Sequence, residues 1–118
     1  MGHDKIITKQ LNDDTIVINP GRLLDNNNAH EMSKAISSAQ CRNFRFIIID
    51  MGALEFISSA GVGSILGSVE ISRDAGGDII LCNADENIIH ILEVLDLTDY
   101  LTLRKNRNDA EEFCRAEG

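Results

Sequence analysis

The spacing of apolar residues changes several times along the chain, and each change predicts an element of secondary structure. Residues 46–49 are an unbroken apolar run that ends at Asp50, and residues 79–82 form a second such run. Uninterrupted runs rich in β-branched residues are typical of strands covered on both faces, as in the middle of a parallel sheet. We therefore predict one buried strand over residues 44–50 and another over residues 79–82.

Elsewhere the apolar residues recur at intervals of three and four, which is typical of helices with one apolar face. Four helices are predicted, and polar residues that favour helix starts precede each of them. The predicted capping residues are, in chain order, Asn28 with Glu31, Ser58 or Ser59, Asp85, and Asn108 with Glu111. The second of these helices is expected to run to about Ala75, where two glycines and an aspartate follow.

Shorter strands complete the predicted fold. Residues 5–11 and 15–18 indicate a hairpin, because the Asn-Asp-Asp stretch between them has the composition of a turn. Residues 97–103 indicate a short edge strand before the terminal helix. The order ββαβαβα, followed by the edge strand and the terminal helix, predicts the α/β class, with a single mixed sheet of about four to five strands and helices packed mainly on one side. We expect residues 1–118 to form one domain.

Composition and charge narrow the possible functions. The 118 residues carry a formal net charge of −8, which argues against a nucleic-acid-binding surface because phosphate contacts need clustered Lys and Arg. The three cysteines are far apart and have no histidine at metal-ligand spacing, so we expect free thiols and no metal. No apolar run approaches the length of a membrane span. We expect a cytoplasmic protein without a cofactor.

Enzyme signatures are absent from the sequence. Gly61, Gly63 and Gly67 are spaced one residue too widely for the dinucleotide fingerprint, and they lie too far from the preceding strand. No phosphate-binding loop or nucleophile-elbow motif surrounds either serine of the pair at 58–59. We therefore assign no catalytic residue and do not expect an enzyme.

The stretch from the buried strand into the second helix offers the best candidate site. Ser58 and Ser59 lie where the first turn of a helix presents free N–H groups and a partial positive charge. Small residues follow, so another protein could approach the hydroxyl of Ser59. Either serine can equally be a simple helix cap, which is the commonest role of a serine at this position.

This stretch resembles the STAS domain family, and the resemblance extends from about Lys5 to about Cys114. The family motif, typically Asp-Ser-Ser/Thr-Gly-Leu-Gly, falls on residues 58–63, with Ser58 in place of the aspartate. The best-known members are bacterial anti-sigma factor antagonists, in which the serine after the aspartate is phosphorylated. The resemblance implies phosphorylation at Ser59, with Ser58 as second choice.

What the resemblance implies is partner switching. The unphosphorylated domain would bind an anti-sigma factor with serine/threonine kinase activity and so release a sigma factor. The kinase would then phosphorylate Ser59, which ends the contact. A protein serine phosphatase would remove the phosphate and restore the binding form. The implied partner-binding residues are Asp25, Asn26, Asn27, Ser58, Ser59, Ala60, Gly61, Val62 and Gly63. Two alternatives stay open: a non-phosphorylated STAS scaffold or sensor subunit of a larger signalling or transport complex, and a small enzyme with Ser59 as nucleophile.

Overall fold

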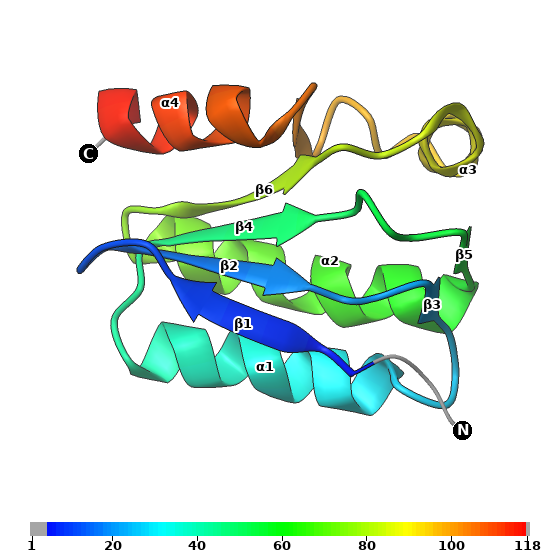
Figure 1. Cartoon of the computed structure of the whole chain (residues 1–118), viewed down its shortest axis with the longest axis horizontal. Helices are drawn as coiled ribbons and strands as arrows, with labels where there is room; N and C mark the ends of the chain where they lie inside the picture. The colour runs from blue at the N-terminus through cyan, green and yellow to red at the C-terminus, as the bar shows by residue number, and fades with distance from the viewer. Residues whose placement is uncertain (1–4, 118) are drawn as a thin grey trace.

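A five-stranded mixed sheet runs through the centre of the computed structural model, which describes residues 5–117 (Figure 1). Its strands lie in the order β1-β2-β4-β6-β7. β1 pairs antiparallel with β2, and the remaining neighbours pair in parallel. The bounds are, in the same order, Ile7–Gln10, Thr15–Asn19, Phe46–Asp50, Asp78–Cys82 and Thr102–Arg104. The predicted mixed sheet and its α/β class are confirmed.

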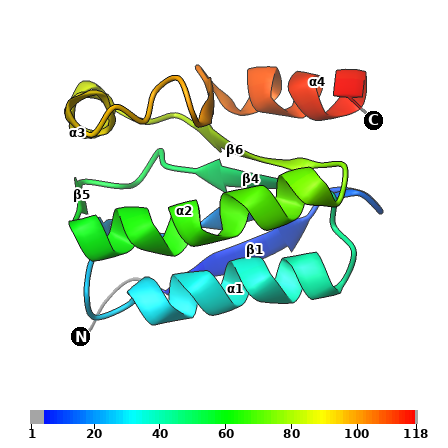
Figure 2. The same ribbon diagram turned by 180° about the vertical axis from the view of Figure 1, so that it is seen from behind.

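Four helices surround the sheet: α1 (Ala29–Cys41), α2 (Ser59–Asp74), α3 (Glu86–Val94) and α4 (Arg107–Glu117). Figure 2 shows α1 and α2 in front of the sheet, and α3 adds Ile88 and Leu92 to the same apolar cluster. Among the helices of residues 5–117, only α4 packs against the opposite face, through Ala110 and Cys114. The expectation that the helices lie mainly on one side is therefore confirmed.

The central strand β4 explains why both faces must be covered. Ile47 and Ile49 belong to the cluster under α1 and α2, whereas Phe46 and Ile48 belong to the cluster under α4. All four side chains are at most 2% exposed. Successive side chains of a strand point to opposite faces, so an unbroken apolar run requires a layer of helix on each.

A second, two-stranded sheet was not predicted from the sequence. β3 (Leu23–Leu24) pairs in parallel with β5 (Phe56–Ile57), so that Leu24 lies opposite Ile57. Arg22 and Glu55 extend the pairing, because the Glu55 N–H donates to the Arg22 carbonyl at 2.7 Å. The small sheet joins the loop before α1 to the loop before α2, and it therefore lies directly beside the candidate site.

The capping box predicted for α1 is wrong. Asn28 occupies the cap position, but its side chain makes no capping hydrogen bond. Its amide is turned back toward the preceding loop, where Oδ1 accepts from the Asp25 N–H at 2.9 Å and Nδ2 donates to the Leu23 carbonyl at 2.8 Å. Because the Asn28 amide makes its hydrogen bonds with the loop, it is not available to cap the first turn of α1.

Two boundaries near the C-terminus also differ from the prediction. The edge strand predicted over residues 97–103 is shortened to β7, because residues 97–101 form turns in which the Leu101 N–H donates to the Leu97 carbonyl. The cap of α4 is Asn106 instead of Asn108, since Asn106 Oδ1 accepts from the Asp109 N–H at 2.8 Å. The helix therefore begins earlier than predicted.

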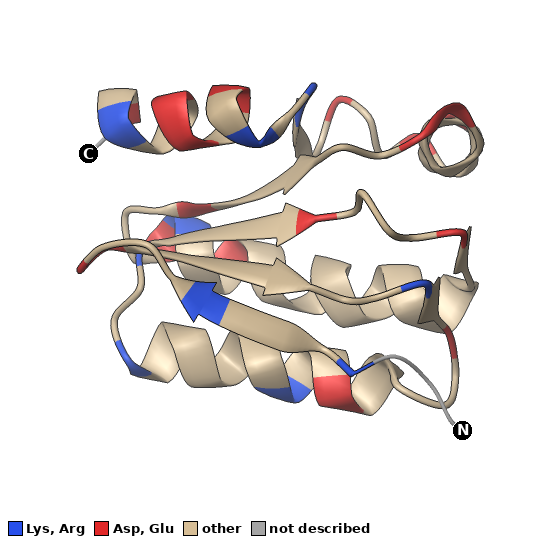
Figure 3. Ribbon diagram, viewed as in Figure 1, with Lys and Arg blue, Asp and Glu red and all other residues tan. Residues whose placement is uncertain are grey.

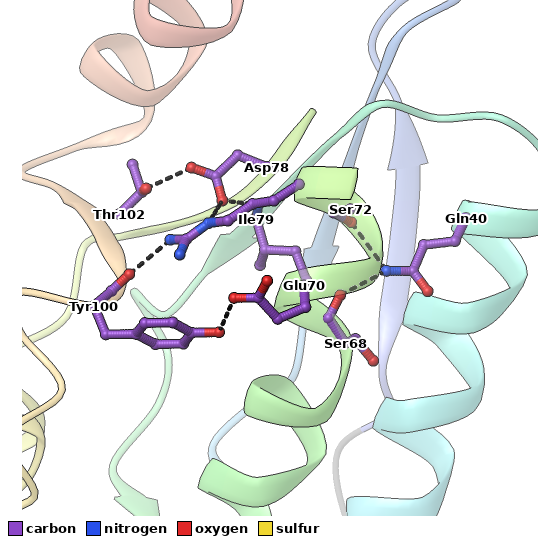
Figure 4. Close-up of polar contacts among 9 residues, drawn as sticks. Gln40, Ser68, Glu70, Ser72, Asp78, Ile79, Tyr100 and Thr102 are labelled. Atoms are coloured by element: carbon purple, nitrogen blue, oxygen red, sulfur yellow. Dashed lines mark hydrogen bonds and ion pairs between the residues drawn. The ribbon is translucent and has the colours of Figure 1, made fainter. Parts of the chain in front are cut away.

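Polar contacts fix the C-terminal half of α2 on both of its flanks (Figure 4). On one side, Arg73 pairs with Asp78 at 3.0 Å and its guanidinium also donates to the Tyr100 carbonyl. On the other, Gln40 of α1 donates to the Ser68 carbonyl and the Ser72 hydroxyl, each at 2.9 Å. These contacts hold the helix rigidly in place away from its N-terminus.

Candidate partner-binding site

Ser58 and Ser59 have different positions at the start of α2. Ser58 is the cap: its backbone is extended and its Oγ accepts from the Gly61 N–H at 3.1 Å. Ser59 is the first helical residue and is exposed, and its hydroxyl has no hydrogen bond to any residue in the described range 5–117. Capping therefore occupies Ser58 and leaves the Ser59 hydroxyl accessible.

The first turn of α2 is held against β3 by very close packing. The Ser58 N–H donates to the Leu24 carbonyl at 2.9 Å. A Cβ atom on Gly61 would lie 2.5 Å from the same carbonyl oxygen and 2.9 Å from Ile57 Cγ1, so only glycine fits here without displacing the backbone. Gly61 is thus needed for the approach of the helix to the small sheet.

The loop residues Asp25, which is half-buried, and Asn26 and Asn27, which are exposed, are brought to the same place as the serines. Asp25 follows Leu24 directly, and the Leu24 carbonyl binds the residue that precedes Ser59. Two segments that are more than thirty residues apart in the sequence therefore meet at the start of α2. The family resemblance implied a partner-binding role for both segments, and that role stays a prediction.

The outer face of α2 is small and uncharged near the site. Ala60 is half-buried, and Gly63 is exposed with open space where a Cβ would lie. Val62 is 4% exposed and packs into the core, so it supports the turn from inside. No acidic residue lies in the first turn of α2, and the first charged residue after Ser58 is Glu70. Figure 3 shows the N-terminal part of this helix without charged residues.

The side chain of Asp50, at the end of β4, contacts α4 and the loops that follow β4 and β6. It accepts from the Asn83 amide at 3.1 Å and from the Gly52 N–H at 2.9 Å, and it pairs with Arg107 of α4 at 3.3 Å. Burial raises the pKa of the Asp50 carboxyl, but these hydrogen bonds and the Arg107 charge outweigh burial and leave that pKa below its usual value. Asp50 therefore anchors α4 to the sheet.

Sequence reasoning missed two residues that shape the site. Asn28 is 1% exposed and holds the loop on which Asp25 lies, whereas the sequence suggested a cap. Phe56 of β5 is 50% exposed and lies two residues before the cap of α2, where a large apolar side chain adds contact area to the surface. An aromatic residue beside a run of small ones is a signal that could have indicated Phe56.

Residues 5–117 contain no cluster of His, Cys, Asp and Glu able to hold a metal ion. Among the same residues, no helix is both long and apolar enough to cross a membrane. Cys41 is exposed, and Cys82 and Cys114 are buried, all three as free thiols.

Comparison with known proteins identifies the family of the chain and several similar proteins. The sequence profile of the STAS domain matches residues 6–110. The anti-sigma F factor antagonist of Paenibacillus polymyxa is 26% identical over 80 residues, which are 68% of this chain and 66% of that protein. The match to the STAS profile, over residues 6–110, includes the whole of the candidate site.

Solved structures share the fold. The Thermotoga maritima protein TM1081 has a TM-score of 0.85 at 22% identity, covering 93% of this chain and 94% of that one. The anti-sigma factor antagonist SpoIIAA in its unphosphorylated form has a TM-score of 0.74 at 23% identity, covering 97% and 99%. The murine anion transporter Slc26a9 has a TM-score of 0.74 at 16% identity, with 91% of this chain but only 18% of that one covered.

Proposed function

The chain belongs to the STAS domain family, and we propose that it is an anti-sigma factor antagonist that works by partner switching. In its unphosphorylated form it binds an anti-sigma factor with serine/threonine kinase activity, which then releases a sigma factor. Phosphorylation of Ser59 by that kinase ends the contact, and a protein serine phosphatase restores the binding form. The protein thus acts in the cytoplasm by binding and not by catalysis.

The observation that carries this proposal is the position of Ser59. Its hydroxyl is exposed, has no hydrogen-bond partner in residues 5–117, and lies at the first helical residue of α2. A kinase can reach such a hydroxyl without unfolding the chain. The family relative from Paenibacillus polymyxa, an anti-sigma F factor antagonist, supports the class of partner.

A phosphate on Ser59 would affect the fold and the interface in opposite ways. It adds about −1.5 to −2 charges at pH 7, and at a helix N-terminus a negative charge is favourable by about 0.3–1 kcal/mol. The first turn of α2 has no acidic residue to oppose it. Buried under a partner, the same dianion loses its hydration at a cost of several kcal/mol. About 3 kcal/mol weakens binding a hundredfold, so this penalty is sufficient for a switch.

Ser58 preserves the local role of the aspartate that the family motif has at this position. An aspartate can cap a helix through its carboxylate, and Ser58 does so through its hydroxyl, which accepts from the Gly61 N–H. The turn that presents Ser59 therefore does not need the carboxylate. Without that charge, the phosphate also meets less repulsion from its own chain.

The test uses the purified protein with each anti-sigma factor kinase encoded in the same genome. ATP and the cognate kinase are expected to add one phosphate, seen by intact mass, to the wild type and none to Ser59→Ala. Ser59→Asp should lose kinase binding while keeping its stability, and Ser59→Ala should bind constitutively. Ser37→Asp, at an exposed position of α1, is the matched control and should bind as the wild type does.

Either of two results would refute the proposal: no kinase of the set phosphorylates the protein, or Ser59→Asp and Ser59→Ala bind the kinase equally well. The first result favours the second candidate function, a non-phosphorylated STAS scaffold or sensor subunit. Two observations favour that candidate. Ser58 stands where the motif has an aspartate, and the same fold makes up a small part of the transporter Slc26a9.

A further inference from the structure

Asn28 is the most deeply buried polar side chain near the candidate site. Its position in the sequence suggests a helix cap, but its side chain does not cap a helix. It is 1% exposed, although asparagine is a mostly exposed residue type. It occupies the cap position of α1 without capping that helix. A buried amide that gives up a local hydrogen bond must be satisfied elsewhere.

The two hydrogen bonds of the Asn28 amide lie on either side of Leu24. Nδ2 donates to the carbonyl of Leu23 at 2.8 Å, and Oδ1 accepts from the N–H of Asp25 at 2.9 Å. These two peptide groups flank the residue whose own carbonyl points at α2. The Leu24 carbonyl belongs to the same peptide group as the Asp25 N–H, so the amide fixes the direction of this carbonyl, because that peptide group cannot rotate without breaking a buried hydrogen bond.

The Leu24 carbonyl is in turn the group that locates the first turn of α2. It accepts from the Ser58 N–H at 2.9 Å, and Gly61 packs so closely on it that no Cβ would fit. Leu24 itself is fully buried and lies opposite Ile57 in the small sheet. A shift of this carbonyl would move Ser58, and with it the hydroxyl of Ser59.

We propose that Asn28 is the positioning residue of the phosphorylation and docking surface. Through Leu24 it sets the place of Ser59, and through the Asp25 N–H it sets the loop 25–27, so that both halves of the surface depend on one side chain. This inference rests on the proposed function for its biological meaning. Its structural part concerns residues 23–61 alone and can be tested without a partner.

A matched control lies at the opposite end of the same two helices. Gln40 also uses an amide to make two hydrogen bonds, from α1 to the Ser68 carbonyl and the Ser72 hydroxyl of α2 (Figure 4). Replacing Gln40 with alanine removes a comparable pair of amide hydrogen bonds far from Ser59. Any effect caused only by general loss of stability should therefore appear in both variants.

The experiment compares Asn28→Ala with Gln40→Ala by amide hydrogen exchange in the free protein. The Ser58 N–H, whose acceptor is the Leu24 carbonyl, should exchange about tenfold faster in Asn28→Ala, which is the usual effect of losing one hydrogen-bonded contact. It should keep its wild-type rate, relative to the most protected amides of β4, in Gln40→Ala. Should Asn28→Ala fail to fold, Asn28→Ser removes the amide while keeping a small polar group.

The same variants are then tested for binding to the kinase that phosphorylates the wild type. Asn28→Ala should bind about tenfold more weakly, and Gln40→Ala should bind as the wild type does. Unchanged Ser58 exchange or unchanged kinase binding in Asn28→Ala would overturn the positioning role, while loss of binding in Ser59→Asp would leave the proposed function intact. If Ser59→Asp also bound normally, the proposed function itself would be wrong.

Discussion

Replacing Gly61 with alanine tests the close contact on which the geometry of the site depends. The added Cβ would lie 2.5 Å from the Leu24 carbonyl oxygen, 2.9 Å from Ile57 Cγ1 and 3.0 Å from Leu24 Cγ. The nearest of these atoms belongs to backbone that is fixed in the small sheet. The start of α2 must therefore move outward by several tenths of an ångström, or the sheet must give way.

The expected change in the free energy of unfolding is the sum of two opposing contributions. Overpacking of this kind costs about 1–3 kcal/mol, and replacing a helical glycine with alanine gains up to about 1 kcal/mol. Gly67, on the same helix, is exposed with open space around its would-be Cβ, so Gly67→Ala keeps the gain without the overlap. The difference between the two variants isolates the overlap, and we expect Gly61→Ala to be less stable than Gly67→Ala by about 1–3 kcal/mol.

Urea unfolding followed by circular dichroism measures both variants against the wild type. We expect the midpoint of Gly67→Ala to rise and that of Gly61→Ala to fall, with the slopes unchanged. If Gly61→Ala were stabilised as much as Gly67→Ala, the Leu24 carbonyl could not lie against the first turn of α2. The inferred coupling between loop 25–27 and Ser59 would then lose its basis.

Two further predictions concern the ionisable groups. Because the folded-state pKa of the Asp50 carboxyl is lowered, the carboxylate stabilises the fold above its unfolded pKa of about 3.9, and this stabilisation is lost as pH falls through the folded value. Asp50→Asn should therefore cost about 1–2 kcal/mol at pH 7, where Arg107 loses one of its two carboxylate partners and keeps Glu111. The gap in urea midpoint should narrow as pH falls below about 4, and a gap independent of pH would contradict the assignment. Burial raises the pKa of the Cys82 thiol to about 12 and that of the Cys114 thiol to about 11. Iodoacetamide at pH 8 should therefore quickly modify only the exposed Cys41. Intact mass should show one adduct in the folded protein and three in urea. Rapid modification of more than one thiol in the folded protein would show that the layer under α4 is open.

Much of the fold could be predicted because its central strands are defined by local pattern. β4 and β6 each contain an unbroken apolar run of four residues, rich in isoleucine, and such a run is typical of a strand covered on both faces. β3 and β5 could not be predicted in this way, since each has two residues and their pairing joins segments far apart in the sequence. Strands so short have no periodicity to detect.

The candidate site was predicted in outline and not in its internal contacts. The motif indicated Ser58 and Ser59 together, and either could have been the cap; the choice depended on which hydroxyl reaches the Gly61 N–H. Asn28 shows the limit of local rules, because its sequence context is that of a helix cap while its amide bonds to the preceding loop. Capping rules consider only the helix, and here the loop competes successfully for the same side chain.

The central claim is that a phosphate on Ser59 abolishes docking while the fold is unchanged. Titration calorimetry of the cognate anti-sigma factor kinase with the unphosphorylated and the stoichiometrically phosphorylated protein measures this directly, with the melting temperature of each form as the check on the fold. We predict a dissociation constant at least about a hundredfold larger for the phosphorylated form, at an unchanged or slightly higher melting temperature. Equal dissociation constants for the two forms would contradict the claim, as would a phosphorylated form that unfolds.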